Sequence, residues 1–326
     1  GSEMCIRDSI SAALDAIPMD LNEPACIYLA PGIYHEKITI NKPYLTILGT
    51  GKSNKDVVLT YDDYALAPMA DIGKLGTFRS YSVFIDTHDV TLQNLTIENA
   101  SGDSLTHGQA IALYADGDRL VIYSCRLIGH QDTLFTGPLP PKEIEPDGFI
   151  GPKQFAPRIN GRQYYKNCYI CGDIDFIFGS ATAYFENCVI ESLCRTTNVN
   201  DIQGYITAAS TPESQEYGYV FSNCKLISKN CPPNSVYLGR PWRNYAKTVF
   251  LECALGNHIH ECGFHDWKKE DARNTVLYAE YRNYPASSAD TTSNNRSLND
   301  DIHCIDGRCI PYPHRAESVS YTHLTL

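Results

Sequence analysis

The sequence has few of the features that would place a protein in a membrane or on a nucleic acid. No stretch approaches the roughly 18 uncharged apolar residues that a membrane-spanning helix requires. Basic residues are in deficit, with 27 Lys and Arg against 38 Asp and Glu, and the formal net charge is -11. Phosphate backbones are bound by clustered positive charge, so this balance argues against nucleic acid. We therefore expect neither a membrane nor a nucleic acid among the partners.

The 13 cysteines lack the spacing of a zinc site. Cys168 and Cys171 form a C-x-x-C pair, but no second pair stands at a metal-binding spacing, so we predict no bound metal. Five cysteines share one position of a recurring pattern, where free thiols acting as small buried apolar side chains are favoured over disulfides. They are Cys125, Cys168, Cys188, Cys224 and Cys253. This usage is typical of a reducing compartment or of a lineage that does not rely on disulfides.

The two ends of the sequence do not match the part between them. Residues 1–9 contain no apolar core of a signal peptide. We interpret residues 1–9 and 318–326 as non-native sequence, of the kind that assembled environmental reads carry at their ends. A native signal peptide would then be missing, and the N-terminus would say nothing about localisation. Residues 286–326 are polar and lack apolar periodicity, so we expect a poorly ordered, partly non-native tail.

The main positive feature is a repeated strand. A short helix is predicted first, capped by Ser9 and with Ile10 and Leu14 on one face. After it, one type of strand recurs at intervals of about 20 to 43 residues. Its copies are 121–128, 164–171, 184–190, 220–227 and, more faintly, 249–255. Such repetition is typical of a solenoid, in which each coil buries its inner face only by stacking on the next.

We therefore predict an all-β fold for residues 10–285, a right-handed single-stranded parallel β-helix with a short N-terminal helix. Inward-facing aliphatic and Cys side chains would form ladders, while the residues between them face water. A β-sandwich is the alternative. It would show hairpin dipeptides such as Asn-Gly between its strands, and Asn160-Gly161 is the one Asn-Gly in the sequence.

Residues 137–158 interrupt the repeat. They hold six of the eighteen prolines and little periodicity, so we predict a long inserted loop. Asp132 and Asp175 are 43 positions apart, and removing these 22 residues leaves 21, about one coil. The two carboxylates are therefore expected on adjacent rungs, roughly 5 Å apart across the stack. An insertion directly after such a strand commonly shapes a substrate groove.

The two aspartates stand inside apolar segments. Asp132 follows Gln131 in one such segment, and Asp175 lies in another. Burying a carboxylate costs several kcal/mol unless it is compensated, so a chain rarely does so without cause. Capping of a turn between strands is the plain alternative. Gln109 upstream and Arg240 downstream, both in strand-like or turn-like settings, favour acyl chemistry on a sugar.

In these segments the sequence resembles the pectin methylesterase family, carboxylic ester hydrolases that remove methyl groups from methyl-esterified galacturonan. The matching motifs stand in the family's order at 32–36, 109–113, 131–134, 175–179 and 238–242. The resemblance runs from about Ile10 to about Tyr284. It implies a parallel β-helix, no cofactor, and a monomer acting on methyl-esterified homogalacturonan or its oligomers. Secretion is the family expectation, and the cytoplasm is the alternative, given 13 cysteines and no visible signal peptide.

The resemblance assigns roles to five polar residues. Asp175 would be the nucleophile and Asp132 the general acid, then the general base. Two close carboxyls do not both ionise cheaply, so one pKa is expected to rise. Arg240 would keep Asp175 ionised through charge-assisted hydrogen bonds. Gln109 and Gln131 match the oxyanion-hole positions, and a side-chain amide ladder inside the solenoid is the alternative for both.

Four aromatic residues are candidate substrate-binding residues. Trp242 and Trp267 are the only two tryptophans, and both fall where the family lines its groove. Phe135 and Phe178 flank the two carboxylates. Flat aromatic faces suit the apolar faces of sugar rings, and plain core packing is the alternative.

Other activities remain open, because the same fold hosts galacturonan hydrolases and lyases. A glycosidic-bond hydrolase would need an Asp cluster with a Gly-His-Gly-type element, of which only His107-Gly108 is present. A lyase would need a calcium-binding acidic cluster and a lone basic catalyst, and neither is evident. A non-catalytic pectin-binding solenoid is the remaining alternative. In every case an acidic protein is expected to bind methylated, neutral stretches better than the polyanionic product.

Overall fold

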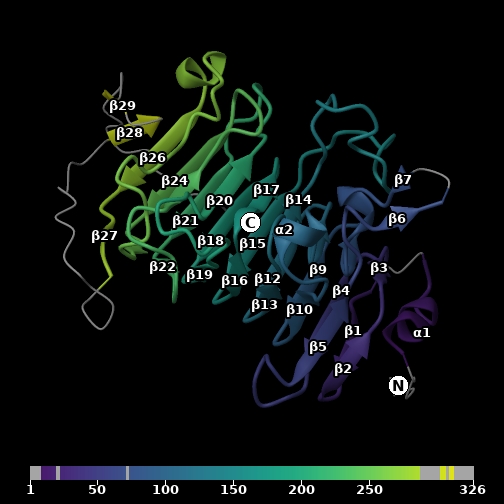
Figure 1. The fold of residues 1–326 in the computed structure, drawn as a ribbon. Coiled ribbons are helices and arrows are strands. Elements are labelled where there is room, and N and C mark those ends of the chain that lie inside the picture. The colour runs from purple at the N-terminus through teal and green to yellow at the C-terminus, as the bar shows by residue number, and fades with distance from the viewer. Residues whose placement is uncertain (1–8, 20–22, 71–72, 287–301, 306–307, 312–326) are drawn as a thin grey trace.

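The fold is known from a computed structural model that describes residues 9–19, 23–70 and 73–286, and the backbone of 302–305 and 308–311. The chain winds through three parallel sheets that run the length of the molecule (Figure 1). A complete coil contributes one strand to each sheet in turn. The predicted parallel β-helix is confirmed.

Neighbouring strands of each sheet come from successive coils. In spatial order, the first sheet consists of β1 (Ala25–Leu29), β4 (Leu45–Gly49), β9 (Val90–Gln93), β12 (Leu120–Tyr123), β15 (Arg162–Lys166), β18 (Thr182–Glu186), β21 (Tyr219–Ser222), β24 (Lys247–Leu251) and β26 (Leu277–Tyr281). The second consists of β2 (Gly32–His35), β5 (Val57–Tyr61), β10 (Thr96–Asn99), β13 (Arg126–Ile128), β16 (Tyr169–Gly172), β19 (Val189–Ser192), β22 (Lys225–Ile227), β25 (Ala254–Leu255) and β27 (Tyr284–Pro285). The third consists of β23 (Val236–Gly239), β20 (Gly204–Ala209), β17 (Ile174–Gly179), β14 (Leu134–Thr136), β11 (Leu113–Ala115), β8 (Val83–Ile85) and β3 (Ile38–Ile40).

The smaller elements lie outside these sheets. They are the helices α1 (Ile10–Asp15) and α2 (Ser104–His107), 3-10 turns at Thr77–Arg79 and Asp271–Asn274, and the antiparallel pair β6 (Pro68–Met69) and β7 (Gly73–Lys74). Ser9 caps α1 as predicted, because its Oγ accepts from the Ala12 N–H at 3.0 Å. Glu36 ties the helix to the first coil by accepting from the Ile10 N–H at 3.0 Å.

The corner between the first and second sheets explains why a cysteine recurs at one position of the repeat. The corner residue has a left-handed backbone, with φ of 54° at Asn94, 55° at Asn167 and 54° at Asn187. Asn adopts this conformation more readily than most residues. The residue that follows is buried inside the solenoid, as Cys168 and Cys188 are. All five cysteines of the predicted ladder are buried and free, which confirms the prediction.

Flat side chains stack along the first sheet on neighbouring coils. The ring centroids of Tyr165, Phe185, Phe221 and Phe250 are separated by 4.5, 4.4 and 4.5 Å in turn. Stacking of identical positions buries the inner face that no coil buries alone.

Residues 137–158 contain no helix or strand, as predicted. The insertion nevertheless packs against the third sheet, where it is the teal loop that rises beyond β14 (Figure 1). The Ser180 hydroxyl donates to the carbonyl oxygen of Pro138. Phe149 is 6% exposed, and its ring centroid lies 5.7 Å from that of Phe78.

The predictions for the chain ends lie largely outside the described residues, including the interpretation of 1–9 and 318–326. Within the predicted tail, β28 (Ile302–Ile305) pairs antiparallel with β29 (Arg308–Pro311), an element that the sequence did not predict. In the part of the chain that the structure describes, no helix has both the length and the apolar character that a membrane crossing requires.

Candidate active site

The register of the third sheet brings the two aspartates onto adjacent coils. Strand β14 pairs with β17 so that Leu134 is opposite Ile177. Asp132 stands two residues before Leu134, and Asp175 stands two residues before Ile177. The Asp132 N–H also donates to the carbonyl oxygen of Ile174 at 3.1 Å. The adjacency predicted from the 43-residue spacing is therefore confirmed.

Both aspartates have an unusual backbone. Their φ angles are 66° at Asp132 and 50° at Asp175, in the left-handed region that residues other than Gly seldom adopt. The pairing of β17 with β20 is irregular between Ile174 and Ile177, where Asp175 stands. Such a conformation costs on the order of 1–3 kcal/mol per residue and persists where the surrounding fold holds it.

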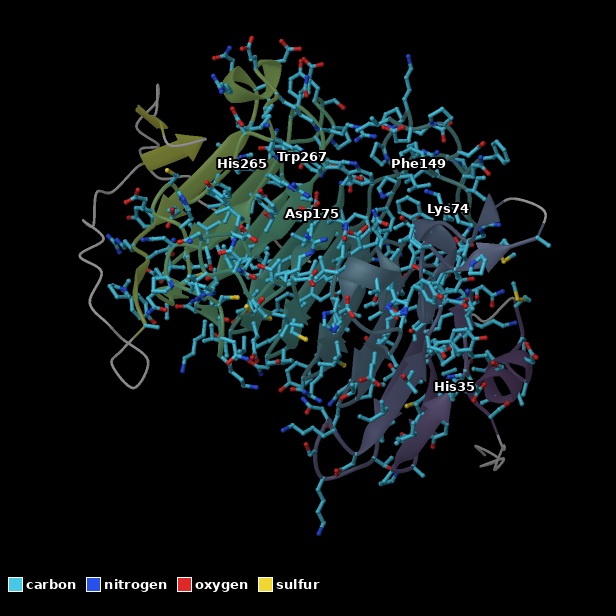
Figure 2. All side chains as sticks on the ribbon, viewed as in Figure 1. His35, Lys74, Phe149, Asp175, His265 and Trp267 are labelled. Atoms are coloured by element: carbon cyan, nitrogen blue, oxygen red, sulfur yellow. The ribbon has the colours of Figure 1, made fainter. Side chains whose placement is uncertain are left out.

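Arg240 fixes the orientation of Asp175. Its Nε donates to Asp175 Oδ1 at 2.8 Å and its Nη2 to Oδ2 at 2.7 Å, a two-point ion pair. The guanidinium is itself held between two rings, 3.7 Å from the Trp267 centroid and 3.9 Å from that of Tyr205. Figure 2 shows Asp175 among the central strands, with Trp267 above it. The carboxylate therefore has one fixed orientation.

Burial and charge give the two carboxyl groups different proton affinities. Asp132 is 7% exposed and Asp175 is 6% exposed. Burial, and then the nearby charge of Asp175, raise the pKa of Asp132 well above its usual range. Burial also raises the pKa of Asp175, but the Arg240 guanidinium opposes this rise. Asp132 is thus the better proton carrier and Asp175 the more readily ionised group.

The two glutamines are half-buried and stand on adjacent coils, where the Ala110 N–H donates to the carbonyl oxygen of Gln131 at 3.0 Å. Among the described residues, neither the Gln109 nor the Gln131 side-chain amide donates to another protein group. The alternative of a side-chain amide ladder inside the solenoid is therefore not observed for them. Both amides remain available to a ligand.

The aromatic residues divide into two groups. Trp242 and Trp267 are half-buried and keep exposed surface. Phe135 is 0% exposed, so the expectation that its ring contacts a sugar is wrong. Phe78 covers it, with ring centroids 5.0 Å apart. Phe178 is 4% exposed and supports Trp242 at 5.6 Å.

Three contributors to the site were missed in the sequence. Tyr205 supports Arg240 from a strand with no distinctive motif. Asp173 is 2% exposed, accepts from Ser104 Oγ at 2.7 Å, and its charge adds to the raised pKa of Asp132. Its position two residues before Asp175 was a usable signal, because it shares the same apolar segment. Lys269 donates from Nζ to the carbonyl oxygen of Trp242 at 2.9 Å, and nothing in its sequence context indicates this contact.

Comparison with known proteins agrees with this geometry. A model of the pectinesterase family matches residues 2–138 and 158–300. The chain belongs to the pectinesterase family. Only residues 139–157, which lie in the insertion, interrupt the match. The proteins of this name are carboxylic ester hydrolases, so the family assigns the chain to the esterases.

Individual pectinesterases resemble the chain over most of its length. It is 33% identical to pectinesterase 31 of Arabidopsis thaliana over 300 residues, 90% of this chain and 84% of the relative. It is 31% identical to pectinesterase QRT1 of the same plant, covering 84% of this chain but only 65% of that relative's length. A crystal structure of a pectin methylesterase in complex with a hexasaccharide superimposes with a TM-score of 0.70 at 29% identity, covering 89% of this chain and 88% of that one.

Proposed function

We propose that the chain removes methyl esters from methyl-esterified galacturonan, converting pectin and water into pectate and methanol. One observation carries the proposal: two buried carboxyl groups stand on adjacent coils, and only Asp175 is held by an arginine. This pairing supplies an ionised group and a protonated group side by side, as ester hydrolysis by a carboxylate requires.

In the first half of the reaction, a carboxylate oxygen of Asp175 attacks the ester carbonyl carbon. The negative charge that develops on the carbonyl oxygen is stabilised by the amide donors of Gln109 and Gln131. Asp132 gives its proton to the departing methoxide oxygen, and methanol leaves. An acyl-enzyme anhydride on Asp175 remains, with Asp132 now ionised.

In the second half, ionised Asp132 takes a proton from water as the water oxygen attacks the acyl carbonyl. The bond to Asp175 breaks, the galacturonate carboxyl is released, and both aspartates return to their starting protonation states. Trp242 and Trp267, both half-buried, are the proposed sugar contacts, and the Trp267 ring also covers Arg240. Phe178 serves as support beneath Trp242.

The experiment that tests this proposal measures three products at once. Purified protein is incubated with highly methylated pectin, and methanol, new reducing ends and unsaturated ends are quantified together. Methanol alone is the expected result. New reducing ends would indicate a glycosidic-bond hydrolase, unsaturated ends a lyase, and binding without any product a pectin-binding solenoid; each of these results would contradict the proposal.

A further inference from the structure

A third buried carboxyl group stands beside the two of the proposed reaction. Asp173 is 2% exposed and lies two residues before Asp175. Its N–H donates to the carbonyl oxygen of His130 at 3.1 Å, and the Asp132 N–H donates to that of Ile174 at 3.1 Å. Asp173 therefore lies opposite the segment that leads into Asp132, on the adjacent coil.

The side chain of Asp173 is held by two neutral donors. Its Oδ1 accepts from the Ile174 N–H at 2.6 Å, and its Oδ2 accepts from Ser104 Oγ at 2.7 Å. The Ser104 oxygen in turn accepts from Arg195 Nε at 3.2 Å, which orients the hydroxyl hydrogen toward the carboxyl. Hydrogen bonds of this kind favour the charged form of a carboxyl group. Asp173 is thus a carboxylate with one orientation.

The partners of Asp173 come from the segments that carry the other proposed catalytic residues. Ser104 begins α2, which ends two residues before Gln109. His130 directly precedes Gln131, and its Nδ1 lies 3.6 Å from Asp173 Oδ2. Asp173 therefore stands where the segments of the two glutamines meet its own segment, which continues into β17.

The charge of Asp173 acts on both proposed catalytic carboxyls. Burial, then the charge of Asp175 and then that of Asp173, raise the pKa of Asp132, and Arg240 opposes them. Burial, and to a smaller extent Asp173, also raise the pKa of Asp175, again against Arg240. Asp173 is thus a negative charge near both carboxyls that takes no part in bond making.

Other titratable or charged side chains approach Asp173 from neighbouring coils. His130 lies before β14, and the Arg195 guanidinium, after β19, bonds the same serine hydroxyl as Asp173 does. Burial, and to a smaller extent Cys194 and Asp173, raise the pKa of the Cys231 thiol to about 11. That thiol therefore stays neutral at neutral pH. Histidine ordinarily changes charge between pH 5 and 8, so His130 needs a control of its own.

The charge around Asp132 changes during the proposed reaction. Before the reaction, ionised Asp175 disfavours a second negative charge on Asp132. In the acyl-enzyme, an oxygen of Asp175 is bonded to the acyl carbon, and that side chain is neutral. Arg240 keeps its positive charge. Asp132 would then lose affinity for the proton that it must take from water, unless another negative charge remains nearby.

We propose that Asp173 is a positioning residue whose permanent negative charge keeps Asp132 basic enough to activate water in the second half of the reaction. The inference rests on the proposed function for that reaction. In this step the water proton moves to Asp132, the water oxygen bonds the acyl carbon, and the bond from that carbon to Asp175 breaks. Repulsion between carboxylates is stronger in a buried site than in water, so a charge beside Asp132 is effective there.

The test compares the first turnover with the steady state. Asp173→Asn removes the charge and keeps the shape, and Ser104→Ala keeps the charge and removes one hydrogen bond. In Asp173→Asn, a less basic Asp132 gives up its proton readily but activates water poorly. We expect the ratio of first-turnover to steady-state methanol release to rise about tenfold, with kcat and KM falling together. Ser104→Ala should keep the wild-type ratio, and an unchanged ratio in Asp173→Asn would overturn the proposal.

The pH profile supplies a second readout. Both carboxyls lose a repelling charge in Asp173→Asn, so both limbs of kcat/KM should move to lower pH. The same shift should persist in a His130→Gln background, and a shift that disappears there would contradict the role of Asp173. Arg195→Gln keeps Asp173 and removes a nearby cation, so its limbs should move slightly to higher pH. This variant tests the charge even if Asp173→Asn does not fold, and limbs that stay in place in it would then contradict the proposal.

A measurement without substrate separates this inference from the proposed function. NMR of labelled aspartate carboxyls, with Asp132 assigned by its absence in Asp132→Asn, reports the pH at which Asp132 ionises. We expect this midpoint to fall by about one pH unit in Asp173→Asn. An unmoved midpoint in a protein that releases methanol would overturn the role of Asp173 alone. A lowered midpoint in a protein that releases no methanol would overturn the esterase proposal and leave the effect of Asp173 on Asp132 standing.

Discussion

At the scale of single residues, the site gives two chemically identical side chains different tasks. Asp132 and Asp175 have the same pKa in water, are equally buried and stand on adjacent coils. The difference between them is Arg240, which bonds one carboxyl at two points and leaves the other without a comparable partner. The assignment of nucleophile and acid therefore depends on one cation and on the rings that hold it.

The pH dependence follows from this asymmetry. Arg240 opposes the rise that burial produces in the pKa of Asp175, so removing it should raise that pKa further. In wild type, kcat/KM should fall on the acid side as Asp175 gains a proton and on the alkaline side as Asp132 loses one. In Arg240→Gln the acid limb should move to higher pH, and kcat should drop by at least about a hundredfold. Arg162→Gln, which alters a surface ion pair with Asp118, is the matched control. An acid limb that does not move would contradict the role of Arg240.

The oxyanion assignment makes a different prediction. The side-chain amide of Gln131 has no acceptor among the described residues, so its truncation leaves no protein group unpaired. Gln131→Ala should therefore lower kcat by about 10²–10³-fold with little change in KM. Gln93→Ala, on the first sheet, controls for loss of an amide elsewhere. Steady-state kinetics on methylated oligomers is the measurement, and an effect confined to KM would mean that Gln131 binds substrate without stabilising the oxyanion.

At the scale of elements, the insertion and the third sheet are joined by a cluster of charged side chains. Asp116 follows β11 directly, is 8% exposed, and its Oδ2 has no hydrogen-bond partner within the described residues. The Nζ atom of Lys153, in the insertion, lies 4.0 Å from Asp116 Oδ2 and 2.5 Å from Asp86 Oδ1. Burial raises the pKa of Asp116 to about 6. The insertion is thus packed over the Asp116 carboxyl, whose protonated form is stabilised by its burial in the folded protein.

The free energy of unfolding should depend on pH through the protonation of the Asp116 carboxyl. A group whose pKa is higher in the folded state than in the unfolded state stabilises the fold below the unfolded value, and this contribution is lost as pH rises from about 4 through about 6. Asp116→Asn should then be more stable than wild type by about 2–3 kcal/mol near pH 8 and no more stable near pH 4. Urea unfolding at the two pH values is the measurement. A gain of equal size at both would show that Asp116 does not titrate as the structure implies.

At the scale of the whole molecule, the solenoid could be predicted because the sequence of one corner recurs along the chain. A left-handed residue such as Asn167, followed by a small buried residue such as Cys168, recurs at five corners between the first and second sheets, so the repeat is visible without any structure. The spacing of Asp132 and Asp175 followed from the same regularity once the insertion was set aside. Their roles came from resemblance, because coil spacing says nothing about proton affinity.

The rest of the site depends on contacts between distant parts of the chain, which no local pattern encodes. Phe135 was expected to touch sugar, but Phe78, 57 positions earlier, covers it. Tyr205 and Lys269 reach the site from coils that show no motif at those positions. The net charge of -11 led us to expect that methylated stretches bind better than product, and this stays a prediction.

The central claim is that Asp175 carries the acyl group and Asp132 carries the proton. Its most direct test is methanol release from methylated pectin by wild type, Asp175→Ala and Asp132→Asn, with pectin binding measured on the same preparations and exposed Asp62→Asn as control. We predict methanol from wild type and Asp62→Asn, and a loss of at least about 10⁴-fold in the two site variants with binding retained. Wild-type rates of methanol release from Asp175→Ala would contradict the account.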